Sequence, residues 1–96
     1  SKANLALTFN SRSSQIGCEL YIKSDVEIFN KILNDKEKVE SELGTDLEFQ
    51  DLPDSMAFRI IKTHECNLFN EEKWNEYFEW LNNQAAKFQK TFKKYF

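Results

Sequence analysis

Hydrophobic and polar residues alternate with a period of two in the first quarter of the chain. Leu5, Leu7 and Phe9 alternate with Ala6 and with a threonine, and after a polar turn at residues 11–14 the alternation resumes over residues 15–23. A period of two is typical of a half-buried β-strand, because successive side chains of a strand point to opposite faces. The two runs therefore predict a β-hairpin.

The second run contains Gly17, Cys18 and Glu19 in succession, which raises the question of whether Cys18 and Glu19 form a catalytic or metal-binding site. The alternation separates them: Cys18 shares a face with Ile16 and Leu20, whereas Gly17 and Glu19 share the opposite face. Side chains that point in opposite directions cannot act on one substrate atom. We interpret Cys18 as a core residue and Gly17 as a bulge or a close backbone approach.

A helix is predicted after this hairpin. Ser24 and Glu27 have the spacing of a capping box, in which each side chain satisfies a free backbone N–H at a helix start. Apolar residues then follow i, i+3, i+4 spacing as far as Leu43, apart from a polar gap near Lys36. Gly44 supplies the left-handed residue that ends the helix.

A second hairpin and a second helix complete the pattern. Residues 47–51 and 56–61 alternate as strands around turn residues 53–55. Asn70 is predicted to cap the last helix, and Phe69 to staple onto Trp74. The helix has one apolar seam with 4-3-4-3 spacing, formed by Trp74, Phe78, Leu81, Ala85, Phe88, Phe92 and Tyr95.

This last helix is long for so small a domain. About 26 residues at ~1.5 Å each span roughly 39 Å, which exceeds the width of a compact chain of 96 residues. We therefore expect the end of the seam, at Phe92, Tyr95 and Phe96, to overhang the sheet and to form an association surface.

The order β-β-α-β-β-α predicts an α+β fold, with an antiparallel four-stranded sheet and two helices packed on one face. The other face of the sheet would be open. The length allows a single domain over residues 1–96. Because the chain opens on an alternating segment without a methionine, we expect it to be part of a longer polypeptide.

Composition and charge limit the classes of function that the chain could have. The net charge of −3 argues against sequence-independent nucleic-acid binding, which depends on a broad basic surface. The lysines near the C-terminus are interpreted as helix-end charges. Two cysteines are too few for a disulfide scaffold, and the chain has no run of about 18 apolar residues that could span a membrane. We expect a cytoplasmic protein with reduced thiols and no membrane partner.

The sequence contains parts of known catalytic and metal-binding motifs, but none of these motifs is complete. The only imidazole, His64, lies two residues before Cys66 without the further ligands that a zinc site requires. Asp46, Glu48 and Gln50 resemble a nuclease metal motif in which the essential lysine is missing. Two distant glycines exclude a phosphate-binding loop. We predict no catalytic residue, no metal site and no cofactor.

Five residues are candidates for a binding surface: Arg12, Glu19, Tyr21, Arg59 and Trp80. Tyr21 and Arg59 are predicted to share the open sheet face, where Glu19 opposes binding of single-stranded nucleic acid because of its charge. Trp80 is either a flank of the core or an exposed anchor for a partner.

The segment "NSRSSQIGCELYI" (residues 10–22) resembles the signature N-(T/S)-R-x-x-x-I-G-x-E-L-Y-I of an uncharacterised prokaryotic family catalogued as domain of unknown function 4268. "FNKILNDKEKVESELGTDLEF" and "WNEYFEWLNNQAAKF" are similar to its first helix with the following strand and to its last helix. The resemblance implies a C-terminal accessory domain, often behind a restriction-type nuclease module. Gln15 and Cys18 depart from it: relatives often have arginine and an aliphatic residue there.

Our leading hypothesis is a non-enzymatic interaction domain with a protein partner or a second copy of itself. The alternative is a nucleic-acid-binding accessory domain that guides an upstream nuclease through Arg12, Lys23, Arg59 and the C-terminal lysines.

Overall fold

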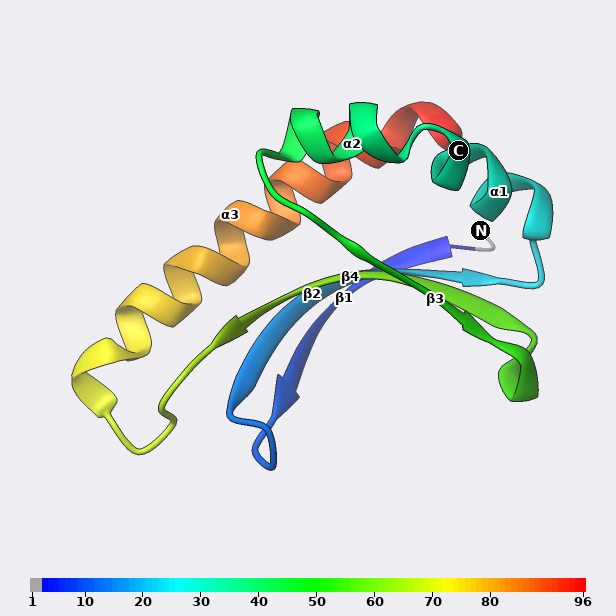
Figure 1. Cartoon of the computed structure of the whole chain (residues 1–96). Coiled ribbons are helices and arrows are strands. Elements are labelled where there is room, and N and C mark those ends of the chain that lie inside the picture. Colours follow the sequence, from blue (N-terminus) through cyan, green and yellow to red (C-terminus); the bar gives the residue numbers. More distant parts are fainter. Residues whose placement is uncertain (1–2) are drawn as a thin grey trace.

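The structure is a computed structural model of the 96-residue chain and describes residues 3–96. It has an α+β fold in which all three helices lie on one side of an antiparallel sheet (Figure 1). The strands are β1 (Ala3–Asn10), β2 (Gln15–Lys23), β3 (Glu48–Leu52) and β4 (Ala57–Glu65). The helices are α1 (Val26–Asn34), α2 (Lys36–Leu43) and α3 (Trp74–Phe92), with short 3₁₀ turns at Pro53–Ser55, Glu71–Lys73 and Lys93–Tyr95. The predicted fold class is confirmed.

The strand order in the sheet is β1-β2-β4-β3. Each predicted hairpin therefore contributes one inner strand and one edge strand, and the two inner strands pair with each other. In that central pair Leu20 lies opposite Ile60, and Tyr21 lies opposite Arg59. The register brings together residues that are about 40 positions apart in the chain.

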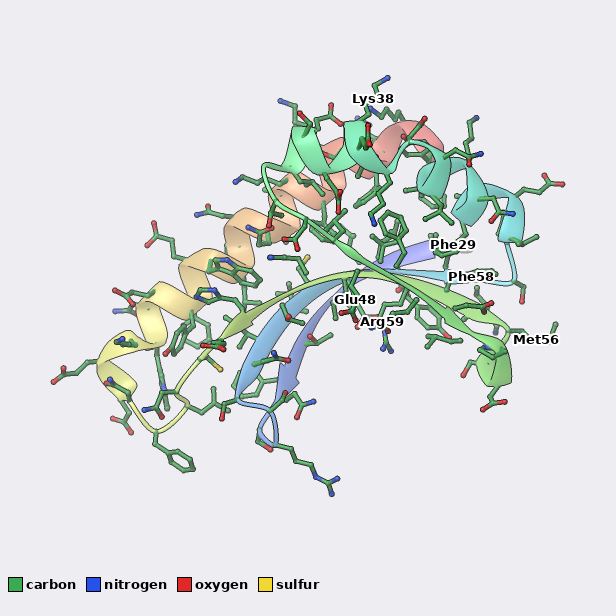
Figure 2. The ribbon with its side chains drawn as sticks, in the orientation of Figure 1. Phe29, Lys38, Glu48, Met56, Phe58 and Arg59 are labelled. Carbon is green, nitrogen blue, oxygen red and sulfur yellow. The ribbon has the colours of Figure 1, made fainter. Side chains whose placement is uncertain are left out.

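The helix-covered face of the sheet holds the main core. Cys18, Leu20 and Ile22 are buried there, as the alternation predicts. The Phe29 ring of α1 stacks on the Phe58 ring of β4, with ring centroids 4.4 Å apart (Figure 2). Large aromatic side chains thus provide much of the contact between the helices and the sheet.

The first predicted helix is divided into α1 and α2 at Asp35. The backbone N–H of Asp35 donates to carbonyl groups of α1, and α2 begins at the next residue. The division falls at the polar gap in the sequence, and it lets Val39 and Leu43 of α2 reach the core. Gly44 ends α2 with φ of 75°, as predicted.

The predicted capping box is wrong. Ser24 has a positive φ of 55°, and its backbone N–H donates to the carbonyl of Met56 at 2.9 Å. Asp25 caps α1 instead, because its Oδ1 accepts from the N–H of Ile28 at 3.1 Å. An aspartate is an equally good N-cap, and the contact with Met56 ties the end of β2 to the start of β4.

The start of the last helix also differs from the prediction. A 3₁₀ turn at Glu71–Lys73 precedes α3, and Asn70 makes no side-chain cap. Phe69 is 98% exposed and therefore forms no staple. The Trp74 indole N–H donates instead to the carbonyl of Leu68 at 3.0 Å.

The apolar seam of α3 is buried over only part of its length. Leu81, Phe88 and Phe92 are buried, whereas Trp74 and Phe78 at the start of the helix are largely exposed. The beginning of α3 is therefore exposed, whereas Phe92 near its C-terminal end is covered. None of the helices within residues 3–96 is both long and apolar enough to cross a membrane.

Candidate functional site

The open face of the sheet is crossed by a row of polar side chains. The Arg59 guanidinium on β4 donates to the Glu19 carboxylate on β2, with Nε and Oε2 2.9 Å apart. Arg59 Nη1 also donates to Gln50 Oε1 on β3 at 3.3 Å, and the Gln50 amide donates to Glu48. Figure 2 shows Arg59 and Glu48 on the side of the sheet away from the helices.

This row lies in a shallow hollow of about 330 Å³ on the open face. Thr8, Thr63 and Gln15 contribute further polar groups to its lining. Two carboxylates and one guanidinium make the charge of the row negative, and the guanidinium is already occupied by Glu19 and Gln50. The hollow therefore has little attraction for an anion such as a phosphate group.

The five candidate binding residues do not form one surface. Glu19, Tyr21 and Arg59 do share the open face. Arg12 lies at the exposed tip of the first hairpin, about 20 Å along the strand from the Tyr21–Arg59 pair. Trp80 is half-buried on α3, on the opposite side of the sheet.

Trp80 is occupied by an intramolecular partner. Its ring stacks on the ring of His64 in β4, with centroids 5.0 Å apart and an angle of 19° between the planes. The fourth strand extends to Glu65, beyond the predicted end at residue 61, and so includes His64. The only histidine of the chain thus helps to hold α3 against the sheet.

Both cysteines are buried. Cys18 is 0% exposed, and its pKa is raised to about 11, first by burial and then by the nearby Glu19 charge. Cys66 packs with Ile16 and Tyr77, and burial raises the pKa of its thiol as well. Among residues 3–96 no group of three or more histidine, cysteine or acidic side chains is placed to hold a metal ion.

The three residues of the predicted association seam have different environments. Phe92 is 2% exposed and belongs to the core, so its side chain is unavailable to a partner in the folded domain. The Tyr95 hydroxyl donates to Asp35 Oδ2 at 2.7 Å and ties the C-terminus to the α1–α2 junction. Phe96 is exposed, beside the edge of the sheet.

One exposed apolar surface is not among the candidates that the sequence predicts. Leu7 and Phe9 of β1 and Trp74 and Phe78 of α3 are 41–64% exposed, and we call these four residues the β1–α3 surface. Phe9, Trp74 and Phe78 line an apolar cavity of about 210 Å³ between the hairpin and α3. The alternation does reveal that Leu7 and Phe9 face the helices, but it cannot reveal that α3 fails to cover them.

The fold and these surfaces define a small α+β domain, with one helix-covered sheet face and one open polar face. A family model described as Domain of unknown function (DUF4268) matches residues 1–96, and the chain belongs to this family. The family resemblance of the sequence motifs is thereby confirmed. Searches of the curated proteins and of the solved structures found no match to the chain.

Proposed function

We propose that this domain is a non-enzymatic accessory domain that associates with a protein partner through the β1–α3 surface. The observation that carries the proposal is the exposure of four large apolar side chains, three of which line one apolar cavity. Contiguous exposed apolar patches on soluble domains are typical of interaction sites. Covering such a patch stabilises a complex by about 25 cal/mol for each Å² of apolar surface removed from water.

The placement of the reactive side chains supports an accessory role. The thiol of Cys18 is fully buried and held protonated, and the carboxylate of Glu19 is bound to Arg59. His64 stacks on Trp80. Glu19 and His64 would have to leave these partners before they could act on a substrate, and Cys18 would have to become exposed.

The alternative of nucleic-acid binding has less support. The cationic side chains of Arg59, Lys62 and Lys94 each form an ion pair with a carboxylate of the same chain. The net charge of −3 also opposes binding to a phosphate backbone. We expect no gel shift of duplex or single-stranded DNA at low salt. A shift that is lost with Arg59→Gln would favour this alternative.

Photochemical crosslinking tests the association. A benzoylphenylalanine is introduced at Phe78, within the β1–α3 surface, or at Lys38, an exposed position on α2 (Figure 2). We expect irradiation of cells to give a discrete adduct from position 78 and none from position 38. The partner peptide is identified by mass spectrometry, and its binding to the purified domain is then measured.

Two results decide the outcome. Binding of the identified partner that weakens at least tenfold with Phe78→Glu, but not with Lys38→Glu, supports the proposal. Equal labelling from both positions, or binding unaffected by Phe78→Glu, overturns it.

A further inference from the structure

The two edges of the sheet differ in length and charge. The edge strand β3 has five residues and carries Glu48 and Asp51. The edge strand β1 has eight residues, ANLALTFN, without a charge or a proline. Soluble proteins usually protect long edges with charged residues, prolines or bulges, because an unprotected edge recruits further strands. The β1 edge has none of these devices.

The hydrogen-bond pattern shows which backbone groups of β1 face outward. The Cys66 N–H donates to the Ser14 carbonyl at 2.8 Å, and these two residues continue the β2–β4 register by one pair beyond Gln15 and Glu65. The backbone groups of even-numbered residues of β2 therefore form their hydrogen bonds with β4. Odd-numbered residues of β2 therefore bond to β1, because successive residues of a strand direct their N–H and C=O groups to opposite sides. These odd-numbered residues of β2 lie opposite even-numbered residues of β1. The N–H and C=O groups of Leu5, Leu7 and Phe9 consequently face away from the sheet.

The same three residues have apolar side chains on the helix side of the sheet. Leu7 and Phe9 are more than half exposed. A groove between β1 and α3 continues from Leu5 past Phe88 to the exposed Phe96. An added strand would thus find both unpaired backbone groups and an apolar groove along one edge.

We propose that β1 pairs in antiparallel orientation with β1 of a second copy of this chain, which joins the two sheets into one of eight strands. The inference rests on the proposed function and names the partner. A second copy fits because the pairing is two-fold symmetric, and a strand without charges places no like charges opposite each other. Phe96 of each copy would lie near the added strand.

The pattern of outward groups also selects the register. Outward-facing residues must pair with outward-facing residues, so the odd-numbered positions of the two strands lie opposite each other. With Leu7 opposite Leu7 of the second copy, Leu5 lies opposite Phe9 of the second copy, and all three pairs are apolar. A register centred on Ala6 would instead place Phe9 opposite a small alanine.

Sedimentation of the purified chain and of two lysine variants is the first test. Leu7→Lys places a charge in the proposed interface, whereas Asn4→Lys places one on the open face of the same strand. We expect a dimer for the parent chain and for Asn4→Lys. For Leu7→Lys we expect at least a tenfold increase in the dissociation constant, with an unchanged circular dichroism spectrum.

Disulfide trapping tests the register. Opposed residues of a hydrogen-bonded antiparallel pair have Cα atoms about 5.5 Å apart, which suits a disulfide. Leu7→Cys should therefore form a covalent dimer under mild oxidation. Asn4→Cys should not, since positions 4 of the two copies would lie about 20 Å apart. Cys18 and Cys66 are buried and do not interfere.

The outcomes separate this inference from the proposed function. A dimer that dissociates with Leu7→Lys, together with a disulfide from position 7 only, supports β1 pairing. A parent chain that stays monomeric at high concentration overturns it, as does a dimer that is indifferent to Leu7→Lys. If the chain is monomeric and a different protein captured at position 78 binds at least tenfold more weakly to Phe78→Glu, the association function stands and the second copy is excluded as its partner.

Discussion

Arg59 and Glu19 form an ion pair across the central strands, and the Glu19 side chain is only 8% exposed. Replacing Arg59 by methionine leaves a buried carboxylate without its partner. Because an unpaired buried charge is costly, we expect a loss of about 3 kcal/mol in the free energy of unfolding. Denaturation by urea measures it, and the double variant Glu19→Leu/Arg59→Met should recover most of the loss.

The Lys62–Asp46 ion pair is the matched control. It has a similar N–O distance of 3.0 Å, but Asp46 is 88% exposed. Lys62→Met should therefore cost less than about 1 kcal/mol. Equal costs for Arg59→Met and Lys62→Met would contradict a structural role for the pair on the open face.

Gly17 lies against Thr8 of the neighbouring strand. A Cβ at position 17 would be 2.5 Å from Thr8 Oγ1, closer than side-chain atoms normally approach. We expect Gly17→Ala to lower the free energy of unfolding by about 1–3 kcal/mol, since the threonine must shift. The double variant Thr8→Ala/Gly17→Ala should regain part of this loss. Thermal unfolding of these two variants and of Thr8→Ala alone measures the coupling, and additive effects would show that no clash exists.

Tyr95 is expected to make stability sensitive to alkaline pH. Burial, and then the hydrogen bond to Asp35, raise its pKa from 10.0 to about 12. Because the raised pKa favours the protonated phenol in the folded state, its contribution is complete below pH 10 and is lost as the pH rises through 12. Tyr95→Phe should cost about 1.5 kcal/mol at neutral pH and remove this alkaline dependence. An unchanged pH profile in that variant would contradict the assignment.

The thiol of Cys18 should react very slowly in the folded protein. Its pKa of about 11, against an ordinary 9.0, reduces the thiolate fraction at pH 8 about 100-fold, and burial blocks access further. A disulfide reagent should label neither cysteine on mixing, and both after unfolding in guanidinium. Prompt labelling of Cys18 in the native state, detected by mass spectrometry, would show that the residue is accessible.

Much of the fold is predictable from local patterns in the sequence. The opposite directions of Cys18 and Glu19 follow from the period of two, and Gly44 ends a helix because it adopts a left-handed conformation readily. The choice of Asp25 over Ser24 as the cap was not predictable, because both residue types cap helices well. The contact between Ser24 and Met56, which are 32 residues apart, decides between them.

The candidate surfaces, like the fold, follow partly from local sequence patterns and partly from long-range contacts. Sequence periodicity by itself assigns Leu7 and Phe9 to one face of the sheet and Phe92 to the apolar side of the last helix, because side-chain direction follows from local backbone geometry. It does not tell which of them are covered. Coverage depends on where α3 crosses the sheet, and contacts among residues distant in the chain set that position: Phe92 packs in the core, while Leu7 and Phe9 remain exposed. The β1–α3 surface and the open β1 edge are therefore properties of the tertiary structure alone.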